Sequence, residues 1–322
     1  MQLLRWGIVG CGNISFDFIT ALRLSERESP AEIKPYGSYK ELFSDPNVDI
    51  VYIGVQNLAH KALTIEALNA GKHVLCEKPM AVNAKEVREM VEAARKNKRF
   101  LMEALWSRFF PAWIEIRRQV LAGELGDVNH FHFNIAGRNP RFDLSTCETP
   151  TMSVGPYCFG LALYLFDEET PTKIHAIGEK NEKGFEEWTN ITLVFKNGRH
   201  ATFYYDWSSI SPWSAYVTGK KGQIQIPCHC WSPTKFQKHF NYIKYCNREI
   251  EEYEFPLKDS EENYRLIHSE GLYYEADHVF DQIAQGKLES EVMSLDTSIK
   301  VACILDEVRR QLNVPFPQDA VE

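Results

Sequence analysis

Residues 3–15, LLRWGIVGCGNIS, decide the fold expected for the first third of the chain. Their apolar first half predicts a buried strand, and a helical pattern over 16–24 follows at once. The turn between them has the form Gly-x-Gly-x-x-Ser. Its first glycine permits a tight turn, its second lets a pyrophosphate approach the backbone, and the small serine allows close helix packing. A dinucleotide is therefore expected beside Gly10, Gly12, Asn13 and Ile14.

Short β-branched runs alternate with helical patterns as far as residue 104, which is typical of parallel strands joined by helices. Asn83, with Glu86 three residues later, predicts the capped start of a helix that runs to Asn97. The other expected elements are strands over 50–55, 74–77 and 100–104 and a helix over 59–70. We therefore expect a Rossmann-type parallel sheet in residues 1–104, the dinucleotide-binding domain.

The second strand of such a sheet should carry the residue that contacts the adenosine ribose, about 20 residues past the glycines. The chain there is polar and is interrupted by Pro30, so that only residues 31–33 could form a short remnant. Arg23 or Arg27 could contact a 2′-phosphate and Glu32 a 2′-hydroxyl, or all three could be solvated charges. This strand is expected to be reduced or missing.

After residue 105 the pattern changes to longer strand-like runs with hairpin turns at Asn197-Gly198 and Lys221-Gly222. The expected strands cover 127–136, 172–179, 190–196, 200–207, 214–218 and 222–226, and the expected helices cover 273–285 and Leu295–Leu312. Residues 236–260 are expected to be a loop or an edge hairpin. The predicted fold class is thus α/β plus α+β, with residues 105–322 forming an open, mostly antiparallel sheet with helices.

Charge and composition exclude several classes of function. The 322 residues carry a formal net charge of −8, and the 36 lysines and arginines are scattered, so no surface for nucleic acid or an anionic membrane is expected. No apolar run reaches the ~18 residues of a membrane span, and the first residues lack the order of a signal peptide. We expect a soluble, cytoplasmic protein.

Two groups of metal-binding residue types occur. Cys228, His229 and Cys230 could turn both thiols to one face of a strand, and His130 and His132 could likewise share a face. No second pair follows at a usual zinc spacing. The eight cysteines are dispersed in apolar contexts, which is typical of reduced thiols. We expect no metal, and metal-dependent chemistry at the Cys-His-Cys group is the lowest-ranked alternative.

Further stretches carry a shared pattern in a fixed order: residues 4–9, 36–39, 74–79 (VLCEKP), 100–111 (FLMEALWSRFFP), 219–222, 274–276 and 316–319. Together they resemble the glucose-fructose oxidoreductase / inositol dehydrogenase / MocA family, over nearly the whole chain. The resemblance implies that the second domain binds substrate and dimerises. Within the family, the sequence most resembles members that oxidise trans-dihydrodiols of aromatic hydrocarbons and D-xylose. These members use NADP and form homodimers.

Such an oxidation transfers a hydride to nicotinamide while a base takes the hydroxyl proton. The resemblance assigns the base to Tyr157 and a cationic partner to Lys78. A tyrosine with an ordinary pKa of about 10 is a poor base, but a nearby ammonium and the positive nicotinamide both lower the pKa of a phenol. A solvated strand-end lysine and a core aromatic residue are the alternatives.

Other site residues are implied by their positions in the family pattern. Those expected at the cofactor are Gln56, Asn57, His60, Glu77, Lys78 and Pro79. Those expected at the substrate are Trp106, Arg108, Arg138 and Ser153. For His60 the alternative is a surface residue at a helix start, for Trp106 a seal at the domain junction, and for Arg138 a surface loop.

Ser153 departs from the family pattern, in which an aspartate helps to bind the substrate. Losing a charged hydrogen bond costs ~1.5–3 kcal/mol, or roughly one to two decades in rate. Two hypotheses follow: an NADP-dependent oxidoreductase whose activity is reduced, and a catalytically impaired dimeric paralogue that acts as a binding or scaffold protein. A homodimer is expected through the second sheet, whose aromatic alternation should leave an apolar face uncovered.

Overall fold

The computed structural model describes residues 4–27, 34–137, 142–243 and 247–320, and the chain forms two compact units. Unit 1 comprises Met1–Phe109 and Leu257–Ala302, and unit 2 comprises Phe110–Pro256 and Cys303–Glu322. The assignment of 257–302 to unit 1 differs from the expectation that residues 105–322 form one domain. The physical reason is that α7 (Leu272–Ala284) packs against α1 (Asn13–Leu22).

Unit 1 contains the expected parallel sheet of four strands. In spatial order they are β1 (Trp6–Val9), β2 (Ile50–Ile53), β3 (His73–Glu77) and β4 (Leu101–Ala104). Val9 lies opposite Ile53, which lies opposite Cys76, and Glu77 lies opposite Ala104. The carboxyl ends of the strands therefore share one edge, where ligands bind in folds of this type.

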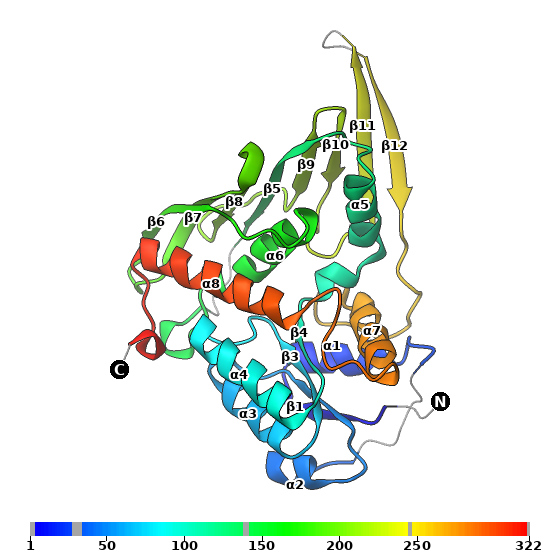
Figure 1. The fold of residues 1–322 in the computed structure, drawn as a ribbon, viewed down its shortest axis with the longest axis vertical. Coiled ribbons are helices and arrows are strands. Elements are labelled where there is room, and N and C mark those ends of the chain that lie inside the picture. The colour runs from blue at the N-terminus through cyan, green and yellow to red at the C-terminus, as the bar shows by residue number, and fades with distance from the viewer. Residues whose placement is uncertain (1–3, 28–33, 138–141, 244–246, 321–322) are drawn as a thin grey trace. The chain divides into compact units, whose positions relative to one another are not determined.

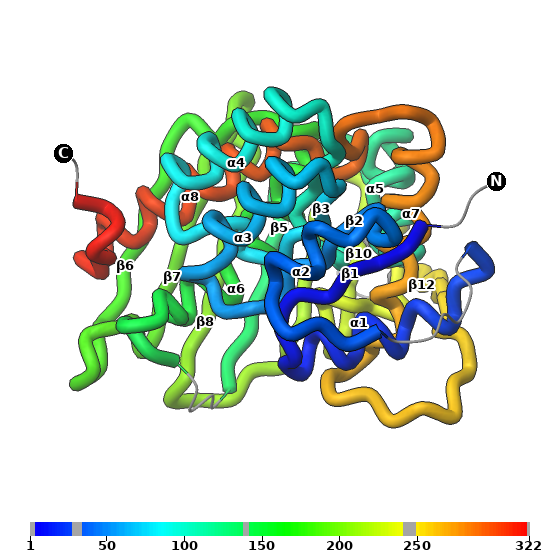
Figure 2. Tube along the Cα trace, turned by 90° about the horizontal axis from the view of Figure 1, so that it is seen from below, coloured from blue at the N-terminus to red at the C-terminus, as the bar shows by residue number. Residues whose placement is uncertain are grey.

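Helices lie on both sides of this sheet (Figure 1, Figure 2). On one side α3 (Asn57–Asn69) packs against α4 (Ala84–Asn97), and on the other lie α1 and α7. The start of α4 is confirmed, because the Asn83 side chain accepts a hydrogen bond from the Glu86 N–H at 2.9 Å. The short α2 (Tyr39–Ser44) precedes β2.

The segment expected to contact the ribose falls partly outside the described residues, which exclude 28–33 and with them Glu32. In the described part of the chain β1 pairs only with β2, so β1 lies at an edge of the sheet. Arg23 forms an ion pair with Glu262, and Arg27 forms one with Asp281. The four side chains are 37–52% exposed, so both arginines are solvated charges, as one of the alternatives had it, and each has a carboxylate partner.

Unit 2 contains an eight-stranded sheet that is mostly antiparallel, as expected, with β5 and β8 as parallel neighbours. Its spatial order is β12-β11-β10-β9-β5-β8-β7-β6. The strands are β5 (Val128–Ala136), β6 (Lys173–Lys180), β7 (Glu186–Val194), β8 (His200–Asp206), β9 (Ala215–Gly219), β10 (Gly222–Ile226), β11 (Lys235–Ile243) and β12 (Asn247–Glu254). Because β11 and β12 pair at the sheet edge, the hairpin is the correct alternative for 236–260.

Helices of unit 2 cover the apolar face of this sheet. Phe131 packs against Trp113 of α5 (Pro111–Leu121), and Phe203 packs against Phe159 of α6 (Pro150–Leu165). The expectation of an uncovered apolar face is therefore wrong, because α5 and α6 bury it. The opposite face, which we call the open face, carries half-buried polar and aromatic side chains: His130, His132, Thr202, Tyr204 and Tyr216.

The last long helix, α8 (Leu295–Leu312), has the bounds expected from the sequence. In the described part of the chain, no helix combines the length and the apolar character that crossing a membrane would take.

Candidate functional site

A tight turn joins β1 to α1 at the carboxyl edge of the parallel sheet. Gly10 has φ +98°, and a Cβ there would lie 2.5 Å from the Gly54 carbonyl oxygen, so a larger residue would displace backbone. The Gly54 N–H donates to the Val9 carbonyl at 2.8 Å, which holds the ends of β1 and β2 together. The first glycine therefore has the local role that the motif predicts.

The second glycine leaves the N-terminus of α1 accessible. A Cβ on Gly12 would meet nothing nearer than the Gly54 oxygen, at 4.0 Å, and α1 begins at the next residue without a side-chain cap. Ser15 lies buried behind the turn, and its hydroxyl donates to the Gly54 carbonyl at 3.3 Å. Helix N–H groups that lack partners attract phosphate. The turn therefore fits the pyrophosphate of a dinucleotide.

Glu77 and Lys78 lie where β3 ends at the same edge. Glu77 is 7% exposed; its Oε1 accepts a hydrogen bond from the Tyr52 hydroxyl at 2.7 Å, and its Oε2 accepts one from the Lys78 backbone N–H at 3.1 Å. Burial raises the pKa of Glu77, while the Tyr52 hydrogen bond and the Lys78 charge act in the opposite direction. The Glu77 carboxyl thus holds the backbone of the half-buried Lys78 in place.

His60 connects the segments that follow β2 and β3. Its ring has no exposed surface; Nδ1 lies 2.8 Å from the Pro79 carbonyl oxygen, and Nε2 lies 3.0 Å from that of Val55. Burial lowers the pKa of His60, so a neutral ring donates to one of these carbonyls. The alternative of a surface residue is wrong for His60, which supports the Lys78–Pro79 segment from inside.

Two further buried carboxyl groups lie in unit 1 and were missed by the sequence analysis. Glu103 is the next-to-last residue of β4; its Oε1 accepts a hydrogen bond from the Met80 N–H at 3.0 Å, and burial raises its pKa to about 7. Glu275 of α7 has no exposed surface, and neither carboxyl oxygen has a hydrogen-bond partner among the described residues. Burial, followed by the charge of Glu77, raises the pKa of Glu275 well above its usual range. The one available signal for Glu103 was its place near the end of an expected strand.

The expected substrate residues after β4 lie in a short 3-10 helix, Trp106–Phe109. Trp106 is 5% exposed, and Arg108 has no exposed surface. The Arg108 guanidinium donates to the Val292 carbonyl at 2.8 Å, and its charge lowers the pKa of Glu103. Both of these partners of Arg108 belong to unit 1. Arg138 lies outside the described residues.

The other two predicted residues lie on α6 in unit 2. Every residue of this helix except Ser153 and Tyr157 is buried. Because the two are four positions apart, they lie on one face of the helix, a turn from each other. On the sheet side of α6, Thr151 and Tyr205 of β8 hydrogen-bond through their hydroxyls at 2.7 Å. The helix therefore presents one phenol and one hydroxyl on its least buried face.

The structure brings the expected cofactor residues together within unit 1. At the carboxyl ends of β1, β2 and β3, or shortly after them, lie Gly10, Gly12, Asn13, Ile14, Gln56, Asn57, His60, Glu77, Lys78 and Pro79. Gln56 is exposed and Asn57 is 8% exposed at the start of α3. Lys78 belongs to unit 1, and Tyr157 and Ser153 belong to unit 2.

The residues considered for metal binding have other surroundings. Cys228 is exposed and Cys230 is buried outside any strand, so the two thiols do not share a strand face. His130 and His132 both hydrogen-bond to the Thr202 hydroxyl, at 2.7 and 3.0 Å. Within the described residues, no three His, Cys, Asp or Glu side chains form a group that could hold a metal ion.

Similarity to known proteins extends over both units. A profile described as "Oxidoreductase family, NAD-binding Rossmann fold" matches residues 4–105, and one described as "GFO/IDH/MocA C-terminal domain" matches residues 113–225. The trans-1,2-dihydrobenzene-1,2-diol dehydrogenase of Sus scrofa is 39% identical over 342 residues, covering 98% of this chain and 99% of that protein. The Homo sapiens protein of the same name is 36% identical over 340 residues, with the same coverage.

The fold is also shared with a solved structure. The aldose-aldose oxidoreductase from Caulobacter crescentus, complexed with glycerol, has a TM-score of 0.81 at 22% identity, covering 97% of this chain and 98% of that one. At this identity the likeness concerns the fold alone. The glycine turn, the two matched segments and the identity along almost the whole length lead to one conclusion: the chain belongs to the GFO/IDH/MocA family and is an oxidoreductase with an NAD(P)-binding Rossmann domain.

Proposed function

We propose that this protein is an NADP-dependent dehydrogenase that oxidises trans-dihydrodiols of aromatic hydrocarbons, D-xylose or both. The observation that carries the substrate class is the 36–39% identity, over 98% of the chain, to trans-1,2-dihydrobenzene-1,2-diol dehydrogenases. D-xylose and NADP are what the resemblance of the sequence to this family implies. The proposal requires Tyr157 and Lys78 to act on the same bound substrate.

In the proposed reaction the substrate carbon loses a hydride and its hydroxyl loses a proton, which leaves a carbonyl product. The oxidised nicotinamide, when bound, supplies the hydride acceptor. Tyr157 takes the proton, and the Lys78 ammonium stabilises the phenolate that Tyr157 needs as a base. Ser153, one helical turn before Tyr157, hydrogen-bonds the substrate without supplying a charge. Glu77 and His60 hold the Lys78–Pro79 segment in position.

The test is oxidation of D-xylose and of a trans-dihydrodiol by the purified protein with NADP+, followed by the absorbance of the reduced cofactor. We expect Tyr157→Phe to lower kcat by about 10²–10⁴-fold, as loss of an acid–base group does, and to leave the dissociation constant of NADP+ unchanged. Tyr39→Phe, at a tyrosine that is 42% exposed in unit 1, is the matched control and should leave kcat unchanged. NADP+ binding without turnover of either substrate would contradict the proposal and favour the impaired paralogue.

NADP rather than NAD is a separate part of the proposal. Arg23 and Arg27 already have Glu262 and Asp281 as partners, so a 2′-phosphate would compete with these carboxylates for either arginine. Fluorescence titrations with NADPH and NADH measure the preference directly. NADPH should bind more tightly, and equal or tighter binding of NADH would contradict this part.

We also propose a homodimer that forms through the open face of the eight-stranded sheet. Half-buried aromatic and polar side chains such as Tyr216, Tyr204 and His132 are of the kinds found at protein interfaces. The resemblance to dimeric family members supports the same surface.

A further inference from the structure

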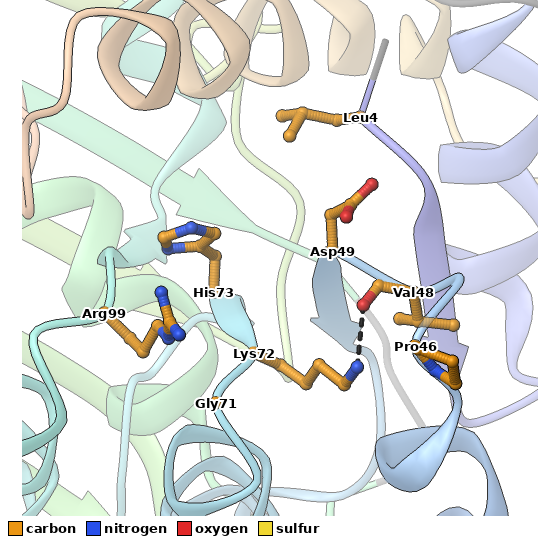
Figure 3. Close-up of a pocket in the computed structure, with 8 residues that line it drawn as sticks. All are labelled: Leu4, Pro46, Val48, Asp49, Gly71, Lys72, His73 and Arg99. Atoms are coloured by element: carbon orange, nitrogen blue, oxygen red, sulfur yellow. Dashed lines mark hydrogen bonds between the residues drawn. The ribbon is translucent and has the colours of Figure 1, made fainter. Parts of the chain in front are cut away.

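A pocket of about 390 Å³ lies at the amino edge of the parallel sheet, away from the Gly10 turn (Figure 3). Most of its residues come immediately before β2, β3 or β4. The lining consists of Leu4, Pro46, Val48, Asp49, Gly71, Lys72, His73 and Arg99. A dinucleotide is expected at the carboxyl edge of the sheet, so this pocket is separate from the site described above.

Lys72 places a buried positive charge at this pocket. Lys72 is 7% exposed, and its Nζ donates to the carbonyl oxygens of Asp45, at 2.6 Å, and of Val48, at 2.8 Å. Figure 3 draws the second of these hydrogen bonds. Among the described residues no carboxylate lies within ion-pair distance of Nζ. Burial lowers the pKa of Lys72, and the charges of Asp49 and Asp45 act in the opposite direction without cancelling this effect, which reflects the cost of a buried charge.

Arg99 and His73 add two further donors. The Arg99 Nε is buried and has no hydrogen-bond partner in the part of the chain that the structure describes. The His73 Nδ1 accepts a hydrogen bond from the Phe100 N–H at 2.9 Å, which leaves the ring proton on Nε2. Burial, reinforced by the Arg99 charge, lowers the pKa of His73 to about 4, so the ring is a neutral donor at pH 7.

The carboxylates close to this pocket already have cationic partners. Asp49 accepts hydrogen bonds from the Arg5 backbone N–H and from its guanidinium at 2.8–3.0 Å. Asp45 is paired with Lys34. Lys72 and Arg99 are therefore left as an excess of positive charge on a chain whose net charge is −8. An anion in the pocket would compensate both cations.

We propose that this pocket binds a small dianion of the phosphate type, with Arg99 as its principal ligand, Lys72 as a buried counter-charge and His73 as a neutral donor. A guanidinium suits phosphate because its planar set of N–H groups can donate to two oxygens at once. Inorganic phosphate and a phosphomonoester offer the same chemistry. The site is independent of the proposed dehydrogenase function, because it uses the opposite edge of the sheet.

The test is calorimetric titration of the full-length protein with inorganic phosphate at constant ionic strength, with and without saturating NADP+. We expect one phosphate per chain whose affinity NADP+ does not change. Arg99→Gln should lower the affinity for phosphate at least tenfold, because a charged hydrogen-bond donor is lost. Arg99→Lys keeps the charge but not the planar geometry, so its affinity for phosphate should lie between those of the wild type and Arg99→Gln. Parallel titrations with glucose 6-phosphate identify the source: tighter binding than phosphate assigns the site to a phosphomonoester, and equal binding assigns it to free phosphate.

The matched control is Arg95→Gln, on an exposed arginine of α4 that is paired with Asp296. It should bind phosphate as the wild type does. Unchanged phosphate binding in Arg99→Gln would overturn the proposal, as would displacement of all the phosphate by NADP+, which would place the anion at the dinucleotide turn. Failure of the protein to oxidise any substrate would leave these comparisons intact, so the two proposals fail separately.

Discussion

Glu103 illustrates how burial changes the chemistry of one side chain in this protein. Its carboxyl group is 2% exposed and accepts one backbone hydrogen bond, from Met80. Burial penalises the charged form and raises the pKa of Glu103 from its ordinary 4.5 to about 7. The folded protein therefore retains this proton over a pH range in which the unfolded chain has released it.

This difference predicts a pH-dependent stability. Between about pH 4.5 and pH 7 the folded state binds more protons at Glu103 than the unfolded state, so the free energy of unfolding should fall as pH rises through this range. Glu103→Gln keeps an acceptor for the Met80 N–H and removes the titration. Between pH 4.5 and pH 8, the free energy of unfolding should fall for the wild type by on the order of 2–3 kcal/mol more than for the variant.

Urea unfolding at several pH values measures this effect. Glu92→Gln, on the exposed side of α4, is the matched control and should follow the wild-type dependence. Equal slopes for Glu103→Gln and the wild type would show that Glu103 ionises normally in the folded protein.

A second residue-level prediction concerns Tyr52, whose hydroxyl donates to Glu77. Tyr52→Phe keeps the ring stacked on Phe18 at a centroid distance of 3.9 Å and removes only the hydrogen bond. Because Oε1 of the buried Glu77 carboxyl then loses the Tyr52 donor, we expect the free energy of unfolding to fall by about 1–3 kcal/mol. Thermal or urea unfolding should show no such loss for the exposed control Tyr39→Phe, and an equal effect in both variants would refute the role given to Tyr52.

At the scale of elements, α6 shows why some helices escape prediction. Nearly all of its residues are buried, so it has no polar face and hence no helical alternation of apolar and polar residues to recognise. Pro156 lies inside α6, whereas a proline in a sequence usually indicates the end of a helix. By contrast α8 has an amphipathic pattern, and its bounds were predicted correctly.

The spacing on α6 leads to a gain-of-function prediction. Ser153 lies one turn from Tyr157 on the least buried face. The family resemblance implies a carboxylate at the position of Ser153. If the proposed reaction is correct, Ser153→Asp should raise kcat/KM by about 10–100-fold, because a charged hydrogen bond to the substrate is restored. Ser153→Asn, which has the same size without the charge, is the control. A matching gain in both variants would show that the charge is not the cause.

At the scale of the whole molecule, the open face of the large sheet predicts the oligomeric state. Light scattering should give about twice the 37.2 kDa of one chain. Tyr216→Glu places a charge on the open face and should shift the protein towards the monomer, whereas Tyr39→Glu in unit 1 should not. A wild-type particle of one chain would rule out the proposed homodimer.

The sequence by itself determined the features that depend on neighbouring residues. The Gly10 turn follows from a backbone conformation that other residues rarely adopt, the cap of α4 from Asn83 and Glu86, and the parallel strands from short buried runs. The candidate cofactor residues that follow β2 and β3 came from the family resemblance instead, and their role stays a prediction.

Only the tertiary structure decided the features that depend on contacts between distant residues. Ser25 hydrogen-bonds Asp277, 252 positions away, and such contacts assign 257–302 to unit 1. The buried carboxyl groups of Glu103 and Glu275 and the excess positive charge around Lys72 were likewise invisible in the sequence. The physical reason is that burial and charge compensation depend on which side chains meet in space, and the periodicity of a segment carries no record of its distant partners.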